Sequence, residues 1–376
     1  MQDTAPQPAS SLARIADWIR LEQASGVGCR TANLLLGAFG SPAAILRAGH
    51  AALAAQVPAP VAAALCAPVS PDLEQLLGAT ADWLAQPLHH IVTLDDADYP
   101  DLLRHIPDPP LLLYITGRRE LLAAPMVAVV GSRNASTQGR ANAEGFAQAL
   151  SEAGLCVVSG LALGIDTAAH EGALRGAGST IAVIGTGIDR VYPARNRALA
   201  HRVAEAGCIV SEYPLGTPPV AGNFPRRNRI ISGMSAGVLV IEAAAQSGSL
   251  ITAQLAAEQG REVFALPGSI HSALAKGCHQ LIREGARLVE TVDEVLEAVQ
   301  GSPLAAPWLR RAAQDLPAGS DALLAALGHD PVAPDELLGR LQGDAASLAG
   351  ELLALELAGV VERLPGGRVQ RVVRSA

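Results

Sequence analysis

The residues of this chain best suited to chemistry are glycines, serines and arginines that follow short apolar runs. The run VAVV at residues 127–130 leads directly into Gly131, Ser132 and Arg133. Small residues at the end of a strand let an anion approach backbone N–H groups, and a guanidinium group can bind two phosphate oxygens at once. The chemistry that this pattern favours is therefore the binding of phosphate.

The same pattern recurs after further apolar runs. Arginines follow two of them, in the segments IDRVYPARNRAL and FPRRNRIISG. Any one of these arginines could be an ordinary surface side chain, but a row of cations beside glycine-rich turns suits a polyanion that crosses several strand ends. Besides the first motif, the candidates are Gly160, Gly185, Gly187, Arg195, Arg197, Arg227, Arg229, Ser247, Gly248 and Ser249.

Groups for catalysis are poorly represented. Arg133 occupies the second-glycine position of a dinucleotide motif, and the sequence contains no Walker A motif. We expect His170 to pack inside the fold and Asp166 to cap a helix. Glu242, together with the segment 247–249, leaves one alternative open, an enzyme similar to the Rossmann-like nucleotide phosphoribohydrolases. We predict no catalytic residue, no metal site and no cofactor.

The spacing of the apolar runs indicates which elements position these residues. From residue 126 to residue 268, six runs recur at intervals of 25 to 30 residues, the length of one strand, one helix and two turns. This alternation predicts an α/β fold, with a parallel sheet covered by helices on both faces. Ligands bind at the carboxyl ends of the strands in such sheets, so the candidates should share one edge. A seventh run, at residues 286–291, is a candidate edge strand.

The regions before the sheet differ in composition. Residues 1–10 are polar and contain prolines, so we expect a disordered tail. Residues 11–85 follow a helical pattern with breaks near Gly26, Gly40 and Pro58, which predicts an N-terminal helical domain. The Rossmann-like domain is expected over residues 86–300.

The C-terminal region reads as a linker and a small domain. Residues 301–318 have the composition of a linker, and a domain is expected over residues 319–376. Its pattern predicts helices at residues 321–327, 334–341 and 345–357, followed by two strands around a Pro-Gly-Gly turn. Three helices and a hairpin form a winged-helix layout.

Charge and cysteine content narrow the class of protein. The net charge is −8, but residues 131–230 hold ten arginines against seven acidic residues, a local basic footprint. Lys276 is the single lysine of the chain, so the abundance of arginine carries no weight apart from its position. The five cysteines lack the spacing of a zinc site, and no apolar run predicts a signal peptide or a membrane span. We expect a cytoplasmic protein.

The segments VAVVGSRNAS, SGLALGIDTAAH, GTGIDRVYP, FPRRNRIIS, EAAAQSGSLITA and FALPG together resemble the DNA-processing protein family, DprA or Smf. The resemblance implies an extended Rossmann-like fold that binds single-stranded DNA, forms a homodimer and loads the recombinase RecA onto DNA during natural transformation. Catalysis and cofactors are not part of that picture. At matching positions it implies DNA contacts for Gly131, Ser132 and Arg133, for Arg227, Asn228 and Arg229, and for Ser247, Gly248 and Ser249.

The resemblance is less regular at other positions. Many members carry a basic residue after the Tyr-Pro of the third unit, where this chain has Ala194, so Arg195 or Arg197 would have to substitute. Residues 25–36 resemble a helix-hairpin-helix of a SAM-like N-terminal domain. The third helix of the C-terminal domain offers Glu351 and Glu356 and no arginine, so we expect contact with protein there rather than with a DNA groove.

Overall fold

The structure is a computed structural model that describes residues 8–302, 323, 326–328, 332–341, 344–357, 361–363 and 367–371. The chain divides into two compact units, residues 1–300 and residues 301–376. The first helix begins at Pro8, so the last three residues of the predicted tail are helical. Residues 1–7 and almost all of the predicted linker lie outside the described residues.

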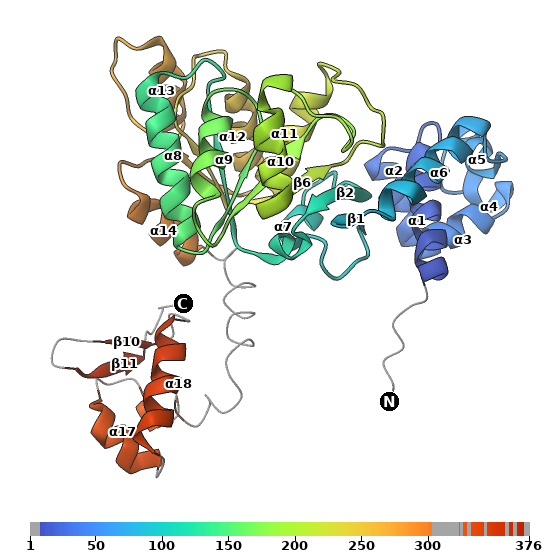
Figure 1. Ribbon diagram of the computed structural model, residues 1–376. Coiled ribbons are helices and arrows are strands. Elements are labelled where there is room, and N and C mark those ends of the chain that lie inside the picture. The colour runs from blue at the N-terminus through green and yellow to red at the C-terminus, as the bar shows by residue number, and fades with distance from the viewer. Residues whose placement is uncertain are drawn as a thin grey trace. The chain divides into compact units, whose positions relative to one another are not determined.

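Short helices form the N-terminal part of the first unit (Figure 1). Ser41 and Ser70 each accept a first-turn N–H, and each is followed by proline at the first helical position. Trp18 and Leu35 are fully buried in the core of this region. The helices are α1 (Pro8–Gln23), α2 (Cys29–Phe39), α3 (Pro42–Arg47), α4 (His50–Ala54), α5 (Ala59–Cys66) and α6 (Pro71–Leu84).

A sheet in the order β1-β2-β6-β5-β4-β3-β7-β8-β9 organises the rest of this unit. From β3 to β9 neighbouring strands are parallel, and every residue of β3 to β7 is buried, which explains their continuous apolar sequences. These strands are β3 (Met126–Val130), β4 (Cys156–Ser159), β5 (Thr180–Ile184), β6 (Cys208–Ser211), β7 (Gly237–Val240), β8 (Glu262–Ala265) and β9 (Arg287–Leu288). The predicted strands, including the edge strand, are confirmed.

Two antiparallel strands that the sequence pattern did not identify extend the sheet beyond β6. They are β1 (His89–Thr93) and β2 (Leu112–Gly117), and the short helix α7 (Asp101–Arg104) lies between them in sequence. Helix α6 contacts β1, so these strands connect the N-terminal helices to the parallel strands.

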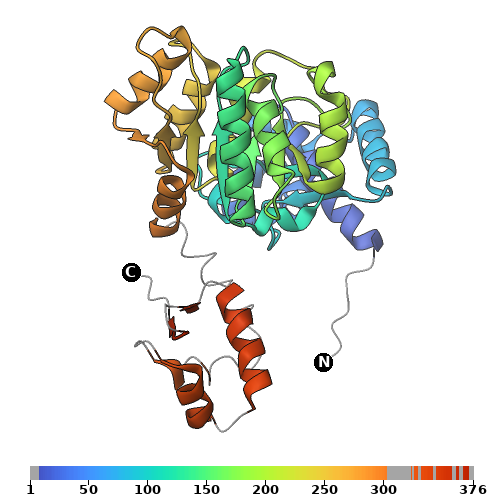
Figure 2. The same cartoon turned by 60° about the vertical axis from the view of Figure 1, so that its left-hand side comes forward.

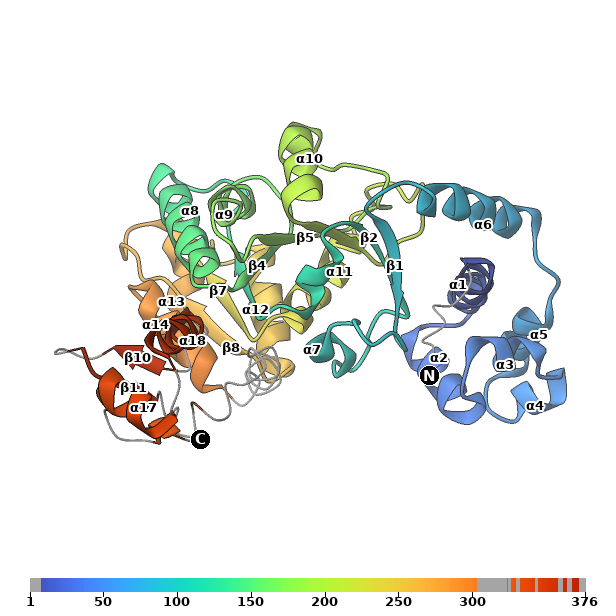
Figure 3. The same ribbon diagram turned by 60° about the horizontal axis from the view of Figure 1, so that its bottom comes forward.

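Helices cover both faces of the sheet. In Figure 3, α8 (Thr137–Glu152), α9 (Ile165–Ala173) and α10 (Arg197–Ala206) lie on one side, with α11 (Asn223–Met234) and α12 (Gly248–Glu258) on the other. Figure 2 shows the first three side by side. The chain continues through α13 (Lys276–Arg283) and α14 (Val292–Gly301). Successive strands run outward from β3 to β6 and then return to β7 on the other side of β3, so the topology reverses between β3 and β7.

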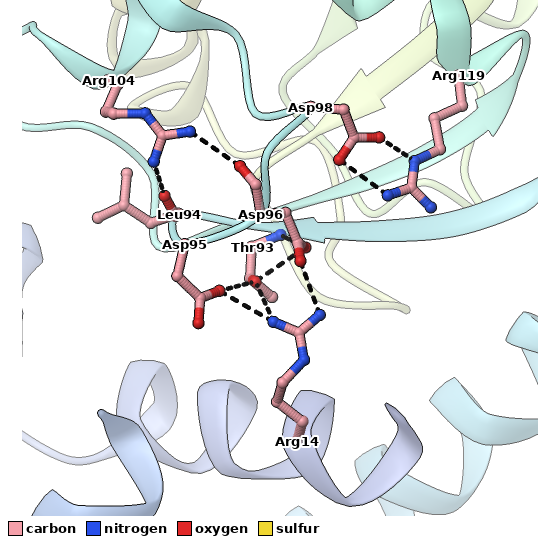
Figure 4. Close-up of polar contacts among 8 residues, drawn as sticks. All are labelled: Arg14, Thr93, Leu94, Asp95, Asp96, Asp98, Arg104 and Arg119. Atoms are coloured by element: carbon pink, nitrogen blue, oxygen red, sulfur yellow. Dashed lines mark hydrogen bonds and ion pairs between the residues drawn. The ribbon is translucent and has the colours of Figure 1, made fainter. Parts of the chain in front are cut away.

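Ion pairs join α1 to the loop after β1 (Figure 4). Arg14 donates from Nη1 to Thr93 Oγ1 at 3.1 Å and to Asp95 Oδ1 at 3.0 Å, and from Nη2 to Asp96 Oδ1 at 2.8 Å. On the other side of the loop, Arg104 donates to the backbone oxygen of Asp96 at 2.9 Å. The loop therefore connects the N-terminal helices to the sheet through charged groups.

The second unit is small. Helices α17 (Pro334–Leu341) and α18 (Ala345–Leu357) have the predicted bounds, and β10 (Val361–Arg363) pairs antiparallel with β11 (Val369–Arg371). Leu337, Leu355 and Val361 are among its buried core residues. The helix predicted at residues 321–327 lies largely outside the described residues. Of the helices that the structure describes, none is long and apolar enough to cross a membrane.

Candidate nucleic-acid interface

A cleft of about 660 Å³ opens at the carboxyl ends of β3 and β7, where the topology reverses. Open α/β sheets bind their ligands at such a position. The predicted candidates that line it are Gly131, Ser132, Arg133, Arg227, Asn228, Ser247, Gly248 and Ser249. Those that do not line it are Gly160, Gly185, Gly187, Arg195, Arg197 and Arg229.

The turn after β3 is held rigidly. The Ser132 N–H donates to the backbone oxygen of Glu242 at 2.7 Å, and Ser132 Oγ accepts from Asn134 N at 3.1 Å. The Glu242 carboxylate accepts from the N–H and hydroxyl of Ser136, the N-cap of α8, at 2.9 and 2.6 Å. A Cβ on Gly131 would stand 2.8 Å from the Glu242 oxygen, so glycine permits this close approach.

Arg133 projects from this turn and remains exposed. Its guanidinium carbon lies 5.9 Å from the ring centroid of Phe224, within the range of a cation–π contact. Tyr192 lies beside Phe224, with 5.5 Å between ring centroids. Both aromatic residues line the cleft, so its wall combines a cation with two rings.

Helix α12 presents its N-terminus to the cleft. Ser247 is the N-cap, and its hydroxyl accepts from Ser249 N at 3.4 Å and pairs with Ser249 Oγ at 2.7 Å. At Gly248, the first helical residue, the place where a Cβ would stand has no heavy atom of the described residues within 4 Å apart from its chain neighbours and the backbone of its own helix. The first N–H groups of a helix lack intrahelical partners and attract anions.

Arg227, from α11, forms a buried wall of the cleft, with 4% of its surface exposed. Its Nη1 donates to Val183 O at 2.6 Å, and its Nε has no hydrogen-bond partner among the described residues. A Cβ on Gly160 would stand 2.0 Å from Nη1 and 2.7 Å from Asp166 Oδ2, so Gly160 provides the space for both side chains. Burial lowers the pKa of Arg227 to about 10, against the attraction of Asp166. The side chain is therefore still a cation at neutral pH.

Asp166 does not have the predicted capping role, because no side chain caps α9. Its Oδ2 instead accepts from Ala162 N, in the turn before the helix, at 3.3 Å. Burial raises the pKa of Asp166, and the charge of Arg227 acts against that increase. Asp166 thus balances part of the charge of Arg227 inside the cleft wall.

Arg229 lies two residues from Arg227, yet it does not line the cleft. It is 4% exposed and donates from Nη2 to Glu212 Oε2 at 2.6 Å and from Nε to Asp108 Oδ2 at 2.9 Å. Cys29 Sγ of α2 is 4.0 Å from the same Nη2. Burial alone would lower the pKa of Arg229, but the carboxylates of Glu212 and Asp108 raise it. The sequence placed this arginine in the phosphate-binding row, whereas the structure places it in a buried ion-pair cluster.

The glycines after β5 are needed for packing. A Cβ on Gly185 would stand 3.1 Å from the Phe224 ring, and one on Gly187 would stand 2.7 Å from Pro214 O. Their predicted role as phosphate contacts remains a prediction. The structure gives them a second reason to be glycine, because Gly185 lets Phe224 lie against the end of β5 and Gly187 leaves room for Pro214 and Thr217.

Arg195 and Arg197 are exposed at the start of α10, outside the cleft. Asn196, between them, is buried and donates from Nδ2 to Leu161 O at 2.8 Å. The two arginines are thus carried by a segment that is fixed to the turn after β4. Both can meet a ligand that extends beyond the cleft, and their role stays a prediction.

Some lining residues were not predicted. Asn134 and Gln246 also line the cleft, each close in sequence to a predicted motif. Pro219 and Ala221 come from the long segment between β6 and α11. Their types carry no phosphate chemistry, so only the fold brings them to the site.

The groups that could have suggested catalysis are engaged with the protein. His170 is fully buried, with Nε2 accepting from Leu161 N at 3.3 Å and Nδ1 2.8 Å from Thr180 Oγ1. Burial lowers the pKa of His170 to about 3, so the ring is neutral, as its predicted packing role requires. Glu242 holds the start of α8. Within the described residues, no three His, Cys, Asp or Glu side chains are grouped to hold a metal ion.

Comparisons with known sequences point to one family. The family described as DNA recombination-mediator protein A matches residues 90–300, and the DprA winged helix domain matches residues 307–367. Protein Smf of Escherichia coli is 43% identical over 298 residues, covering 77% of this chain and 79% of that protein. DNA processing protein DprA of Streptococcus pneumoniae is 52% identical over 203 residues, covering 54% of this chain and 71% of that protein.

Comparisons with solved structures point to the same family. The X-ray structure of DprA from Streptococcus pneumoniae superimposes with a TM-score of 0.65 and 38% identity, covering 75% of this chain and 97% of that chain. A structure of DprA from Helicobacter pylori, described for its single-stranded DNA binding mode, gives a TM-score of 0.51 and 30% identity, covering 56% of this chain and 95% of that one.

Proposed function

The chain belongs to the DNA recombination-mediator protein A family, and we propose that it binds single-stranded DNA at the cleft between β3 and β7 without transforming it chemically. The observation that carries this proposal is the composition of the cleft. One exposed arginine, one buried arginine and the N-terminus of α12 converge on one space at the reversal of the topology. The Helicobacter pylori relative, whose description names single-stranded DNA, supports the choice of ligand.

The charges around the cleft favour a chain of phosphates. Arg133 is exposed at its mouth, and Arg195 and Arg197 are exposed beyond it, after β5. A strand that crosses from β7 toward β5 would meet these cations in succession. Bases can stack on Tyr192 and Phe224, but two rings are few, so affinity should come mainly from charge and tolerate any sequence.

We propose further that the protein protects incoming DNA and, as a homodimer, loads RecA onto it, as the family resemblance implies, and that it acts in the cytoplasm. Loading can be tested apart from binding. Surface variants would be screened by oligonucleotide binding and by RecA-dependent strand exchange in the same preparations. Variants that bind DNA normally and fail to promote exchange would support a separate loading surface. A complete set of variants in which the two properties always fall together would contradict it.

A salt titration tests the DNA site. Binding of the full chain to an unstructured oligonucleotide should weaken with salt, with a slope of log K against log salt of about −0.7 per neutralised phosphate. Arg133→Glu should weaken binding by about 100-fold and reduce the slope, with an unchanged unfolding transition. Arg175→Glu is the matched control, because Arg175 is exposed just after the C-terminal end of α9, at the opposite edge of the sheet. Equal affinity of the two variants would refute the assignment.

The phosphoribohydrolase alternative has its own assay. Release of free base from nucleoside monophosphates at a catalytic rate would support it and contradict a role without chemistry. The engagement of Glu242 by Ser136 is the structural reason to expect no release.

A further inference from the structure

The cleft is large enough for a small molecule. Its volume of about 660 Å³ falls within the roughly 300–1,000 Å³ typical of sites for small molecules. It is walled by β3, by α11 and α12 and by the segment before α11, rather than by one turn. Such a space can hold a compact molecule as well as part of a polymer.

Two groups in the lining of the cleft favour an anion. Arg227 lines the cleft with 4% of its surface exposed, and its buried Nε has no hydrogen-bond partner in the part of the chain that the structure describes. Gly248, at the start of α12, also lines the cleft, with open space beside it. The charge of Arg227 and the first N–H groups of a helix both attract a phosphate in the cleft. A phosphate monoester carries more charge than a phosphodiester, so it gains more from these groups.

The lining of the cleft also favours a flat ring. Phe224 and Tyr192 stand 5.5 Å apart with their planes inclined at 39°, and Arg133 lies over Phe224. Tyr192 is 46% exposed, so much of its side chain is accessible to a ligand. Aromatic rings and guanidinium planes stack on any nucleobase, because every base has a π-face.

No carboxylate is available to select a ribose. Acidic groups that read ribose hydroxyls need free oxygens at this edge. Asp166 is engaged with Ala162 N and faces Arg227, and Glu242 is engaged with Ser136. Among the described lining residues, Asp166 is the single acidic side chain. Deoxyribose and ribose forms should therefore bind alike.

We propose that the cleft accepts one free nucleoside monophosphate, with its phosphate at Arg227 and the N-terminus of α12 and its base at Tyr192 and Phe224. The inference deepens the proposed function, because the nucleotide would occupy the site that we assign to DNA. Free nucleotides then compete with the DNA strand, and the cleft does not distinguish DNA from RNA.

Displacement of a fluorescent oligonucleotide from the full chain tests this at constant ionic strength. The competitors are dAMP, AMP, deoxyadenosine and inorganic phosphate. We expect dAMP and AMP to compete equally, within about twofold, and each at least about tenfold better than deoxyadenosine or phosphate. Competition by dAMP no better than by phosphate would overturn the inference, and so would a preference for one sugar above tenfold.

A matched pair of proline variants locates the phosphate. Proline is tolerated at the first helical position and removes only the N–H, and Ser247 has the extended backbone that a following proline requires. Gly248→Pro should weaken dAMP competition by about tenfold. Thr137→Pro makes the same kind of change at the first residue of α8, which does not line the cleft, and should match the wild-type protein within about twofold. Equal competition in both variants, with unchanged unfolding transitions, would overturn the phosphate position.

Failure of this inference can be told from failure of the proposed function. An oligonucleotide that binds the wild-type chain and not Arg133→Glu, with no competition by dAMP, contradicts only the nucleotide site. An oligonucleotide that binds both chains equally contradicts the DNA site, whatever the nucleotides do.

Discussion

Arg227 and Arg229 lie two residues apart on α11, and each is 4% exposed, yet they serve different regions of the molecule. Arg227 lines the cleft, and its buried Nε has no partner among the described residues, whereas Arg229 lies in the ion-pair cluster with Glu212 and Asp108. Successive residues of an α-helix point about 100° apart, so side chains at i and i+2 face nearly opposite directions. One helix thus carries both a residue of the candidate site and a residue of the buried ion-pair cluster.

The two regions differ in how the buried charge is balanced. Burial lowers the pKa of Arg227 despite the nearby Asp166, whereas two carboxylates raise the pKa of Arg229 against the same effect of burial. Arg229 also has an Nη1 without a partner among the residues that the structure describes, but it lines neither the cleft nor the smaller cavity beside Glu212. We infer that an incompletely balanced cation on a cleft wall serves a ligand, and that a balanced one stabilises the fold.

The largest effect should follow from removing Arg229 from its ion-pair cluster with Glu212 and Asp108. Arg229→Met leaves Glu212 and Asp108 without their buried cation, so the free energy of unfolding should fall by about 3–5 kcal/mol, measured by denaturant titration. Arg226→Met is the control on the same helix. Its side chain is 56% exposed and 3.7 Å from Glu212, so it should cost less than about 1 kcal/mol. Full stability with a loss of DNA binding in Arg229→Met would instead support the predicted role of Arg229 as a phosphate contact.

The second largest effect should follow from a change at Gly160, which lies beside Arg227 in the wall of the cleft. Gly160→Ala places a methyl group where Arg227 Nη1 and Asp166 now lie, so the arginine must move. We expect a loss of about 1–3 kcal/mol in stability and about tenfold in oligonucleotide affinity. Gly145→Ala, in the middle of α8 with open space around it, should instead stabilise the protein by up to about 1 kcal/mol and leave binding unchanged. Normal DNA affinity in Gly160→Ala would separate Arg227 from the site.

Glu22, near the ion-pair cluster of Arg229, should make the stability of the protein depend on pH. Glu22 lines a cavity of about 320 Å³ with Glu212, Cys29 and Arg226. Burial raises the pKa of Glu22 to about 8, with a smaller contribution from Glu212, and the hydrogen bond from Gln23 acts in the opposite direction. The folded protein therefore holds this proton more tightly than the unfolded chain, whose carboxyl has a pKa near its ordinary value.

This difference in pKa determines how stability changes with pH. The contribution of Glu22 to stability is fully present below the unfolded pKa and is lost as pH rises through about 8. From pH 6 to pH 9 the loss should reach roughly 2 kcal/mol. Denaturant titrations of the wild-type protein and Glu22→Gln at both pH values measure it. The variant should lose less stability over this range, and parallel losses in both proteins would refute the assignment.

The sequence predicted the parallel part of the sheet because its strands are apolar throughout and end in small residues. It missed β1 and β2, since HHIVT and LLYITG do not belong to the repeating unit of strand and helix. It predicted that Arg133, Arg227 and the segment 247–249 lie at one edge of the sheet, and the structure confirms that arrangement. It could not tell Arg227 from Arg229, because Asp108, one of the partners of Arg229, is 121 residues away and only the folded chain brings the two together.

The smallest effect concerns Arg14, which joins the N-terminal helices to the sheet as Arg229 does, but at the surface. Its side chain is 44% exposed and pairs with Asp95 at 3.0 Å and Asp96 at 2.8 Å (Figure 4). Water screens exposed pairs, so Arg14→Ala should lower the free energy of unfolding by less than about 1 kcal/mol, and 1 M salt should remove most of the difference from the wild-type protein. A loss as large as that of Arg229→Met, unaffected by salt, would mean that burial does not decide which arginine holds the two regions together.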